Sequence, residues 1–191
     1  MIIGVVPSIK ETYSNQIEIS LDIKLINFLK KIYKSPKINI LHQKKFSEID
    51  LLCLSGGNDL TRFKNDKPNI IRSQLDKFYY QICKKKNIPI LGICYGAQFI
   101  VSYEGGEMKK KNHLGKHEVI FANKDYKRIV NSYHNFIITK LSKKFEIIAT
   151  ARDGSIECFK YKNKKIMGVI WHPERELSFR KNDFNLIRKF L

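Results

Sequence analysis

A cysteine between two glycines is the residue best suited to nucleophilic chemistry in this chain. Residues 92–96 read Gly-Ile-Cys-Tyr-Gly and end an apolar run. This pattern is typical of a nucleophile on a sharp strand-to-helix turn, where small neighbours let the backbone approach a substrate. The helix that follows directs its N-terminal N–H groups at the thiol and favours the thiolate. We predict that Cys94 is the nucleophile and that the N–H of Tyr95 donates to an oxyanion; for this motif alone, a buried structural cysteine is the alternative.

A thiol nucleophile needs a base, and residues 172–174, which read His-Pro-Glu, supply a candidate. They follow an apolar run over residues 166–171, so His172 is expected at the end of a buried strand. Proline restricts the backbone between the two side chains, so that both can leave the strand end on one side. Taken alone, the motif is a turn. Together with Cys94 it predicts His172 as the base and Glu174 as the carboxylate that orients it.

A glycine pair follows a third apolar run. Residues 55–59 read Ser-Gly-Gly-Asn-Asp and come directly after the apolar residues 51–54. Consecutive glycines allow backbone N–H groups to turn toward a carbonyl oxygen. We predict Gly57 as the second oxyanion donor, with Gly56 as its alternative and an ordinary tight turn as the structural explanation.

These segments need a scaffold that gathers them, and strand-like and helix-like patterns alternate as in an α/β protein. Strands are predicted over residues 1–6, 37–41, 50–54, 88–93 and 166–170, and shorter ones over 118–121, 128–131, 145–151 and 155–161. Helices are predicted over 18–33, 71–86 and 183–191 and from residue 97, and Asp153-Gly154 is expected to be a hairpin turn. We expect one domain over residues 1–191, with a mostly parallel central sheet flanked by helices and extra antiparallel strands in the second half. The carboxyl ends of parallel strands share one edge, where Cys94 and His172 are expected to meet.

In this order, the three segments resemble the class I glutamine amidotransferases. The resemblance implies a flavodoxin-like α/β domain that hydrolyses a γ-glutamyl amide with a Cys-His-Glu triad, here Cys94, His172 and Glu174. It also implies contacts with the glutamyl group from further residues: Gly56, Gln98, Ser132, Tyr133 and His134.

The resemblance extends to one branch of that family. Residues 54–59, 131–134 and 151–157 look like those of the free-standing γ-glutamyl hydrolases, which release glutamate from γ-glutamyl amines. The branch usually has a second His and then a Gln after the position of His134, whereas this chain has Asn135 and Phe136. The side of the pocket that receives the amine is therefore expected to differ. A glutaminase that supplies ammonia to a separate synthetase, as one subunit of a larger enzyme, is the alternative function.

The charge is strongly positive, with 36 Lys and Arg against 18 Asp and Glu, a formal net charge of +18. The basic residues are 29 Lys and 7 Arg, scattered between elements, which indicates a solvated surface rather than a nucleic-acid-binding face. A positive field still attracts small anions. We therefore expect a small-molecule substrate that carries phosphate or a nucleotide. The resemblance to the γ-glutamyl hydrolase branch implies γ-glutamyl-CDP-amidate, of capsule phosphoramidate assembly, as one such substrate. γ-Glutamyl polyamines and folyl polyglutamates are the alternatives.

Cysteine spacing and hydropathy indicate a reduced, cytoplasmic protein. There is no CxxC pair, and the three cysteines other than Cys94, namely Cys53, Cys83 and Cys158, are expected in the core. The apolar runs are far shorter than the ~20 residues of a membrane helix, so no membrane partner is expected. The predicted chemistry needs no cofactor. His113 and His117 are four residues apart, but Gly115 and the strand pattern after it argue against a helical metal pair, so no metal is expected.

Overall fold

The computed structural model describes residues 1–13, 15–122 and 126–190. Its helices are α1 (Ile23–Ile32), α2 (Lys67–Lys85), α3 (Tyr95–Tyr103), the short 3-10 helix η1 (Pro173–Arg175) and α4 (Lys181–Phe190). Its strands are β1 (Ile2–Val6), β2 (Ser8–Thr12), β3 (Gln16–Ser20), β4 (Lys37–Ile40), β5 (Leu51–Leu54), β6 (Ile90–Ile93), β7 (Glu107–Lys110), β8 (Gly115–Phe121), β9 (Lys127–Ser132), β10 (Phe136–Lys140), β11 (Phe145–Ala151), β12 (Ile156–Tyr161) and β13 (Ile166–Val169). Leu191, the last residue of the predicted C-terminal helix, lies outside the described residues.

A large mixed sheet runs through the molecule, with the strand order β4-β1-β5-β6-β13-β12-β11-β8-β9. From β4 to β13 every neighbouring pair is parallel, and from β13 to β9 every pair is antiparallel. The expected combination of a parallel central sheet with antiparallel strands in the second half is confirmed. The expected hairpin turn at Asp153-Gly154 is also confirmed, because it joins the antiparallel pair β11 and β12.

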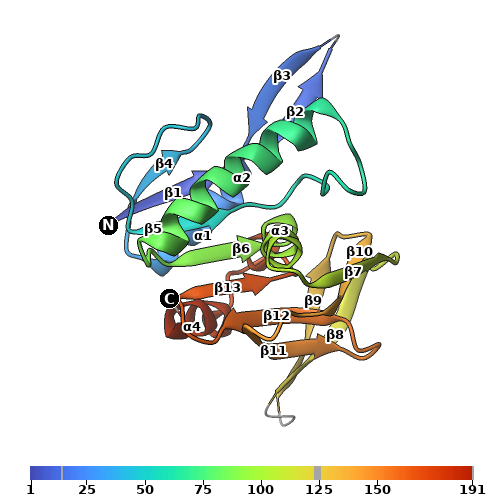
Figure 1. The fold of residues 1–191 in the computed structure, drawn as a ribbon. Helices are drawn as coiled ribbons and strands as arrows, with labels where there is room; N and C mark the ends of the chain where they lie inside the picture. The colour runs from blue at the N-terminus through green and yellow to red at the C-terminus, as the bar shows by residue number, and fades with distance from the viewer. Residues whose placement is uncertain (14, 123–125, 191) are drawn as a thin grey trace.

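Helices cover both faces of the parallel half. One apolar core joins α2 and α3 to the sheet, and a second joins α1 and α4 to the opposite face. Figure 1 shows α2 and α3 in front of the strands. Strands covered on both faces are apolar at every position, as in β5, where all of Leu51–Leu54 is buried. Cys53, Cys83 and Cys158 are buried in these cores, as expected.

The prediction of a helix over residues 18–33 was wrong in its first part. Gln16–Ser20 forms β3, which pairs with β2 in a two-stranded hairpin. Polar and apolar residues alternate over this segment, which suits a strand. The helix begins later because Asp22 caps it, accepting a hydrogen bond from the backbone N–H of Lys24 over 2.9 Å.

The β2–β3 hairpin stands apart from the main sheet and projects beyond it (Figure 1). Sequence patterns also missed β7 and β10, which pair with each other beside β12. Helix α2 starts earlier than expected, at a cap formed by Asp66. No helix in the described ranges is long and apolar enough to cross a membrane.

Candidate active site

Cys94 lies at the turn between β6 and α3 and is 7% exposed. Its φ of 49° and ψ of −107° form a conformation that non-glycine residues rarely adopt. The backbone N–H of Cys94 donates to the carbonyl of Val169 over 2.8 Å, which ties the turn to β13. Gly96 must be glycine here, because a Cβ atom on it would overlap the carbonyl of Leu54. The thiol is thus held in a strained turn at the N-terminus of α3.

His172 and Glu174 emerge beside Cys94 because they follow β13, the parallel neighbour of β6. Both side chains are buried. The Nδ1–H of His172 donates to Oε1 of Glu174 over 2.6 Å, which leaves Nε2 as the free ring nitrogen. This is the arrangement in which a carboxylate orients an imidazole for proton transfer.

The ionisation of His172 reflects its neighbours. Burial is the strongest influence on its pKa and acts to lower it. The charge and hydrogen-bond interactions with Cys94 and Glu174 together outweigh burial and raise the pKa of His172 to about 10. The raised pKa favours the protonated ring, which can act as a proton donor.

Asn131 holds the backbone of His172, a role that the sequence did not reveal. Its side-chain amide donates to the carbonyl of His172 over 2.8 Å. Its side-chain oxygen accepts from the backbone N–H of the same residue over 2.9 Å. The two hydrogen bonds join the end of β9 to the end of β13. They restrain the imidazole from the antiparallel half of the sheet.

The glycine loop after β5 lies against the other two segments. A Cβ atom on Gly56 would lie 2.8 Å from Cε1 of His172 and 3.4 Å from Cβ of Cys94, so only glycine fits without displacing the imidazole. Gly57 takes a φ of 105° and lines the neighbouring cleft. The loop is held in place by Arg72, which is fully buried and donates to the carbonyl of Ser55 over 2.7 Å.

The anchor Arg72 is itself held by Asp76, one helical turn along α2, at 2.9 Å. A buried arginine needs such a partner, because an unpaired buried charge is strongly destabilising. The spacing of four residues between Arg72 and Asp76 was visible in the sequence. The contact of Arg72 with Ser55, a residue 17 positions earlier in the chain, was not.

A cleft of about 660 Å³ opens over Cys94 and His172. The β2–β3 hairpin forms one wall through residues 9–12, a contribution that the sequence pattern did not reveal. Asn58 fastens that wall to the glycine loop, because its side chain exchanges two hydrogen bonds with the backbone of Ile9, at 2.9 and 3.0 Å. The loops after β5, β6, β9 and β13 contribute most of the remaining lining, and α2, α3, β10 and η1 add single residues or pairs.

The residues expected to contact a glutamyl group divide into two sets. Gln98, Tyr133 and His134 line the cleft together with Cys94 and His172. Gly56 instead lines an adjoining cavity of about 230 Å³. Ser132 is fully buried, and its hydroxyl donates to the carbonyl of His113, away from the cleft.

Asn135 and Phe136, the two departures from the expected branch pattern, both line the cleft. The carbonyl of Phe136 accepts a hydrogen bond from the side chain of Gln98 over 2.9 Å. Its ring stacks on Phe63, with centroids 4.0 Å apart and planes inclined by 8°. Phe136, supported by its stacking on Phe63, therefore presents an aromatic ring at a cleft position where a polar residue was expected.

The parallel sheet, the helices on both its faces and the loops gathered at its carboxyl edge define a flavodoxin-like α/β protein. The sequence pattern of the family described as "Glutamine amidotransferase class-I" matches residues 14–191. The chain belongs to this family. A relative in Campylobacter jejuni, named gamma-glutamyl-CDP-amidate hydrolase, is 40% identical over 150 residues, which are 74% of this chain and 72% of that protein.

Other proteins resemble this chain in sequence or in fold. A glutamine-hydrolysing GMP synthase of Francisella tularensis is 35% identical over 104 residues, 49% of this chain but 20% of that protein. A crystal structure of a protein described as a GMP synthase subunit from Thermoplasma acidophilum has a TM-score of 0.72 at 23% identity, covering 100% of this chain and 92% of that one. A glutamine amidotransferase of Thermotoga maritima has a TM-score of 0.65 at 17% identity, covering 91% and 75%. These two likenesses show the fold.

Proposed function

We propose that this protein hydrolyses a γ-glutamyl amide to L-glutamate and an amine. The observation that carries the proposal is the convergence of Cys94, the His172–Glu174 pair and the Gly56–Gly57 loop at one sheet edge, under an open cleft. The name of the Campylobacter jejuni relative supports the same reaction class.

The proposed reaction has two halves. The Cys94 thiolate attacks the γ-carbonyl carbon, and the N–H groups of Gly57 and Tyr95 donate to the resulting oxyanion. His172, whose raised pKa favours the protonated ring, gives its proton to the departing amine as the carbon–nitrogen bond breaks. A γ-glutamyl thioester remains on Cys94. Water then attacks the thioester, passes a proton to His172 and releases glutamate.

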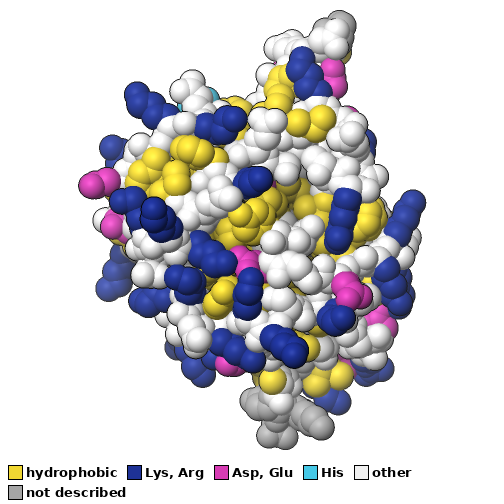
Figure 2. Space-filling model, in the orientation of Figure 1, with side chains coloured by type: hydrophobic (Ala, Val, Ile, Leu, Met, Phe, Trp, Pro, Cys, Tyr) yellow, Lys and Arg dark blue, Asp and Glu magenta, His cyan; other side chains and the backbone are white. Residues whose placement is uncertain are grey.

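The substrate class that we propose is a γ-glutamyl conjugate whose amine carries phosphate or a nucleotide. Lys and Arg side chains are spread over the whole face drawn in Figure 2, so the anion would be attracted by a general field. Within the cleft, Lys64 pairs with Asp66 and Arg175 pairs with Asp22, both at 3.2 Å. Among the described lysines and arginines of the cleft, Lys10 alone forms no ion pair, and it is the proposed phosphate contact.

The test of the reaction is glutamate release from a panel of substrates: L-glutamine, γ-glutamyl amines, a γ-glutamyl peptide, a folyl polyglutamate and γ-glutamyl-CDP-amidate. Strong turnover of one conjugate, with glutamine poor, is the expected result. Slow turnover of glutamine alone would favour the second candidate, a glutaminase that feeds ammonia to a separate synthetase. That candidate draws support from the GMP synthase similarity. No release from any member would contradict both.

Replacing Lys10 with alanine is expected to raise KM for a nucleotide-linked substrate by about two- to fivefold, the range of one exposed ion pair. The value of kcat and the kinetics on a small neutral γ-glutamyl amide should not change. Wild-type kcat/KM on the nucleotide conjugate should also fall with ionic strength, because salt screens exposed charges. Steady-state kinetics on both substrates check this.

The matched control is Lys77→Ala, which removes an exposed lysine of α2 outside the cleft lining. It should leave both substrates unaffected. An equal KM change in the two lysine variants, or a flat salt profile, would contradict the proposed contact.

A further inference from the structure

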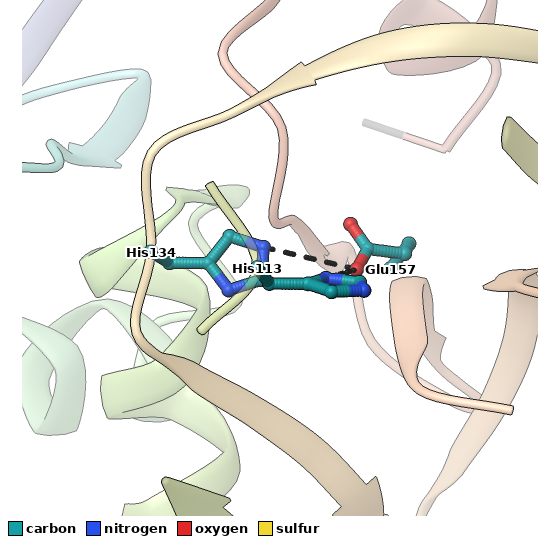
Figure 3. A group of neighbouring side chains, drawn as sticks. All are labelled: His113, His134 and Glu157. Carbon is teal, nitrogen blue, oxygen red and sulfur yellow. Dashed lines mark ion pairs between the residues drawn. The ribbon is translucent and has the colours of Figure 1, made fainter. Parts of the chain in front are cut away.

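Three histidines and one glutamate gather behind the cleft, on the antiparallel half of the sheet. His117 lies in β8 and His113 just before it, His134 follows β9, and Glu157 lies in β12. The ring nitrogens Nδ1 of His113 and Nε2 of His117 each lie 3.4 Å from Oε1 of Glu157, and Nε2 of His134 lies 3.8 Å from it. Figure 3 shows the rings of His113 and His134 directed at that carboxylate.

These polar atoms are buried and lack partners. Within the described chain, the three nitrogens and both carboxylate oxygens of Glu157 have no hydrogen bond, although the side chain of Glu157 is only 1% exposed. Leaving so many buried polar atoms unpaired would be costly, and such groups call for an explanation such as an ion. The directed lone pairs of the cluster are suited to a cation.

The outer ring nitrogens of His134 and His113 already have the neighbours that metal-binding histidines use. Nδ1 of His134 lies 3.0 Å from the carbonyl of Phe136, so it carries the proton and leaves Nε2 as a lone pair that faces inward. Nε2 of His113 lies 3.4 Å from a carboxylate oxygen of Asp153. Metal ligands commonly direct their second nitrogen at a carbonyl or a carboxylate in this way.

We propose that His113, His117, His134 and Glu157 bind one Zn²⁺ ion. Three imidazole nitrogens and one carboxylate oxygen form a donor set that Zn²⁺ accepts in tetrahedral geometry. Bonds of about 2.0–2.1 Å to a tetrahedral ion place the donors about 3.3 Å apart. The ring nitrogens of His113 and His117 lie close to this distance from Oε1 of Glu157, at 3.4 Å, and that of His134 lies at 3.8 Å. The rings of His117 and His134, with centroids 6.4 Å apart, must approach each other for His117 to become the fourth donor. His113, His134 and Glu157 place one donor atom each within 4.8 Å of one another.

This proposal reverses the expectation of no metal. That expectation considered only His113 and His117 and correctly placed them off a helix. Gly115, with a φ of 102°, lies between them, and the two rings approach to 4.2 Å between centroids. His134 and Glu157, which complete the donor set, come from distant parts of the chain.

A site with four protein ligands has no open position, so the ion would be structural. It would join β8, β12 and the segment after β9, and His134 also lines the cleft. The adjacent Tyr133 lies edge-on to His172, with ring centroids 5.4 Å apart. The ion would therefore stiffen the cleft wall without touching Cys94. The inference is independent of the proposed reaction.

The test is metal binding by the full chain after treatment with a chelator, carried out in a Cys94→Ala background so that the thiol cannot bind the probe. Calorimetric titration with Zn²⁺ should give one site per chain with micromolar or tighter affinity. Co²⁺ should give the intense visible absorption of tetrahedral coordination. Zn²⁺ should raise Tm by several degrees, because a ligand of the folded state stabilises it.

Glu157→Gln and His113→Gln should each weaken Zn²⁺ binding more than about 100-fold, because losing a ligand exceeds the effect of losing an outer partner. His42→Gln, which changes an exposed histidine outside the cluster, should bind like the parent. The rival occupant is a proton shared between His113 and Glu157. Absence of stoichiometric binding, an octahedral Co²⁺ spectrum, or equal binding by all variants would overturn the proposal. The binding stoichiometry and the Co²⁺ spectrum need only the parent protein. A misfolded variant would therefore not leave the question open.

Discussion

Replacing Cys94 with alanine is expected to abolish γ-glutamyl hydrolysis, with kcat falling by at least about 10⁴-fold. The physical reason is that no other described thiol borders the cleft, and the remaining groups can only polarise the carbonyl. The substitution removes one buried atom and keeps the same backbone, so stability should change by about 1 kcal/mol. That corresponds to about 2–4 °C in Tm for a chain of this size. Glutamate release and thermal unfolding measure the two effects.

The matched control is Cys83→Ala, which removes a buried thiol of α2 away from the cleft. Burial raises the pKa of Cys83 to about 12, so it is a neutral, unreactive thiol at neutral pH. This variant should keep wild-type turnover. With wild-type protein, a glutamyl adduct on Cys94 should also be detectable by mass spectrometry after rapid acid quench. Glutamate release by Cys94→Ala at the wild-type rate would refute the thioester mechanism.

Replacing His172 with asparagine is expected to lower kcat by about 10³–10⁴-fold. Asparagine cannot carry the proton that the departing amine needs, and it lacks the ring nitrogen that would take the proton of the Cys94 thiol. The fold should be retained, because the backbone hydrogen bonds to Asn131 do not involve the substituted side chain. Single-turnover kinetics with an activated ester substrate separate the loss of the proton donor from the loss of the imidazole beside Cys94. The leaving group of an activated ester departs without protonation. Such a substrate should therefore recover part of the rate lost in the variant.

Glu174→Gln should have a smaller effect on kcat and a diagnostic effect on the pH profile. The carboxylate favours the protonated imidazole and is among the groups that raise the pKa of His172. Without it the pKa of His172 falls, so the proton donor is lost at lower pH. The alkaline limb of kcat/KM should therefore move to lower pH. A variant with reduced activity but an unchanged alkaline limb would contradict this role of Glu174.

Glu146→Gln is the control for the pH profile, because this carboxylate lies on β11 and pairs with Lys160 at 3.0 Å. Its removal should leave both the rate and the alkaline limb unchanged. A shift of the same size in both variants would show a general electrostatic effect of the charge change instead of a specific contact with the imidazole.

Much of the scaffold was readable in the sequence because it depends on near neighbours. The runs that became β1, β5, β6 and β13 are apolar at successive positions, which is typical of strands covered on both faces. The turn motifs followed directly from these runs. Parallel pairing then implied that the segments after β5, β6 and β13 share one edge. The β2–β3 hairpin was missed, because its alternating segment adjoins a true helix and the two were merged.

The polar contacts that position the candidate site were decided only by the tertiary structure. Asn131 contacts His172, and Arg72 contacts Ser55, through hydrogen bonds between residues far apart in the chain. No local pattern identifies such partners, because their contact depends on strand order and on which side chains lie on the same face.

The histidine cluster shows most clearly which features the sequence determines and which depend on the tertiary structure. The sequence by itself determined the strands of the parallel half of the sheet, the order of the strand-end motifs and the family to which the chain belongs. It showed His113 and His117 only as two residues four apart, ahead of the strand expected over residues 118–121. Antiparallel pairing of β8 with β9 and with β11, and of β11 with β12, places them beside His134 and Glu157. Sequence spacing encodes contacts within one element, whereas a site built from several strands exists only once their order and register are set.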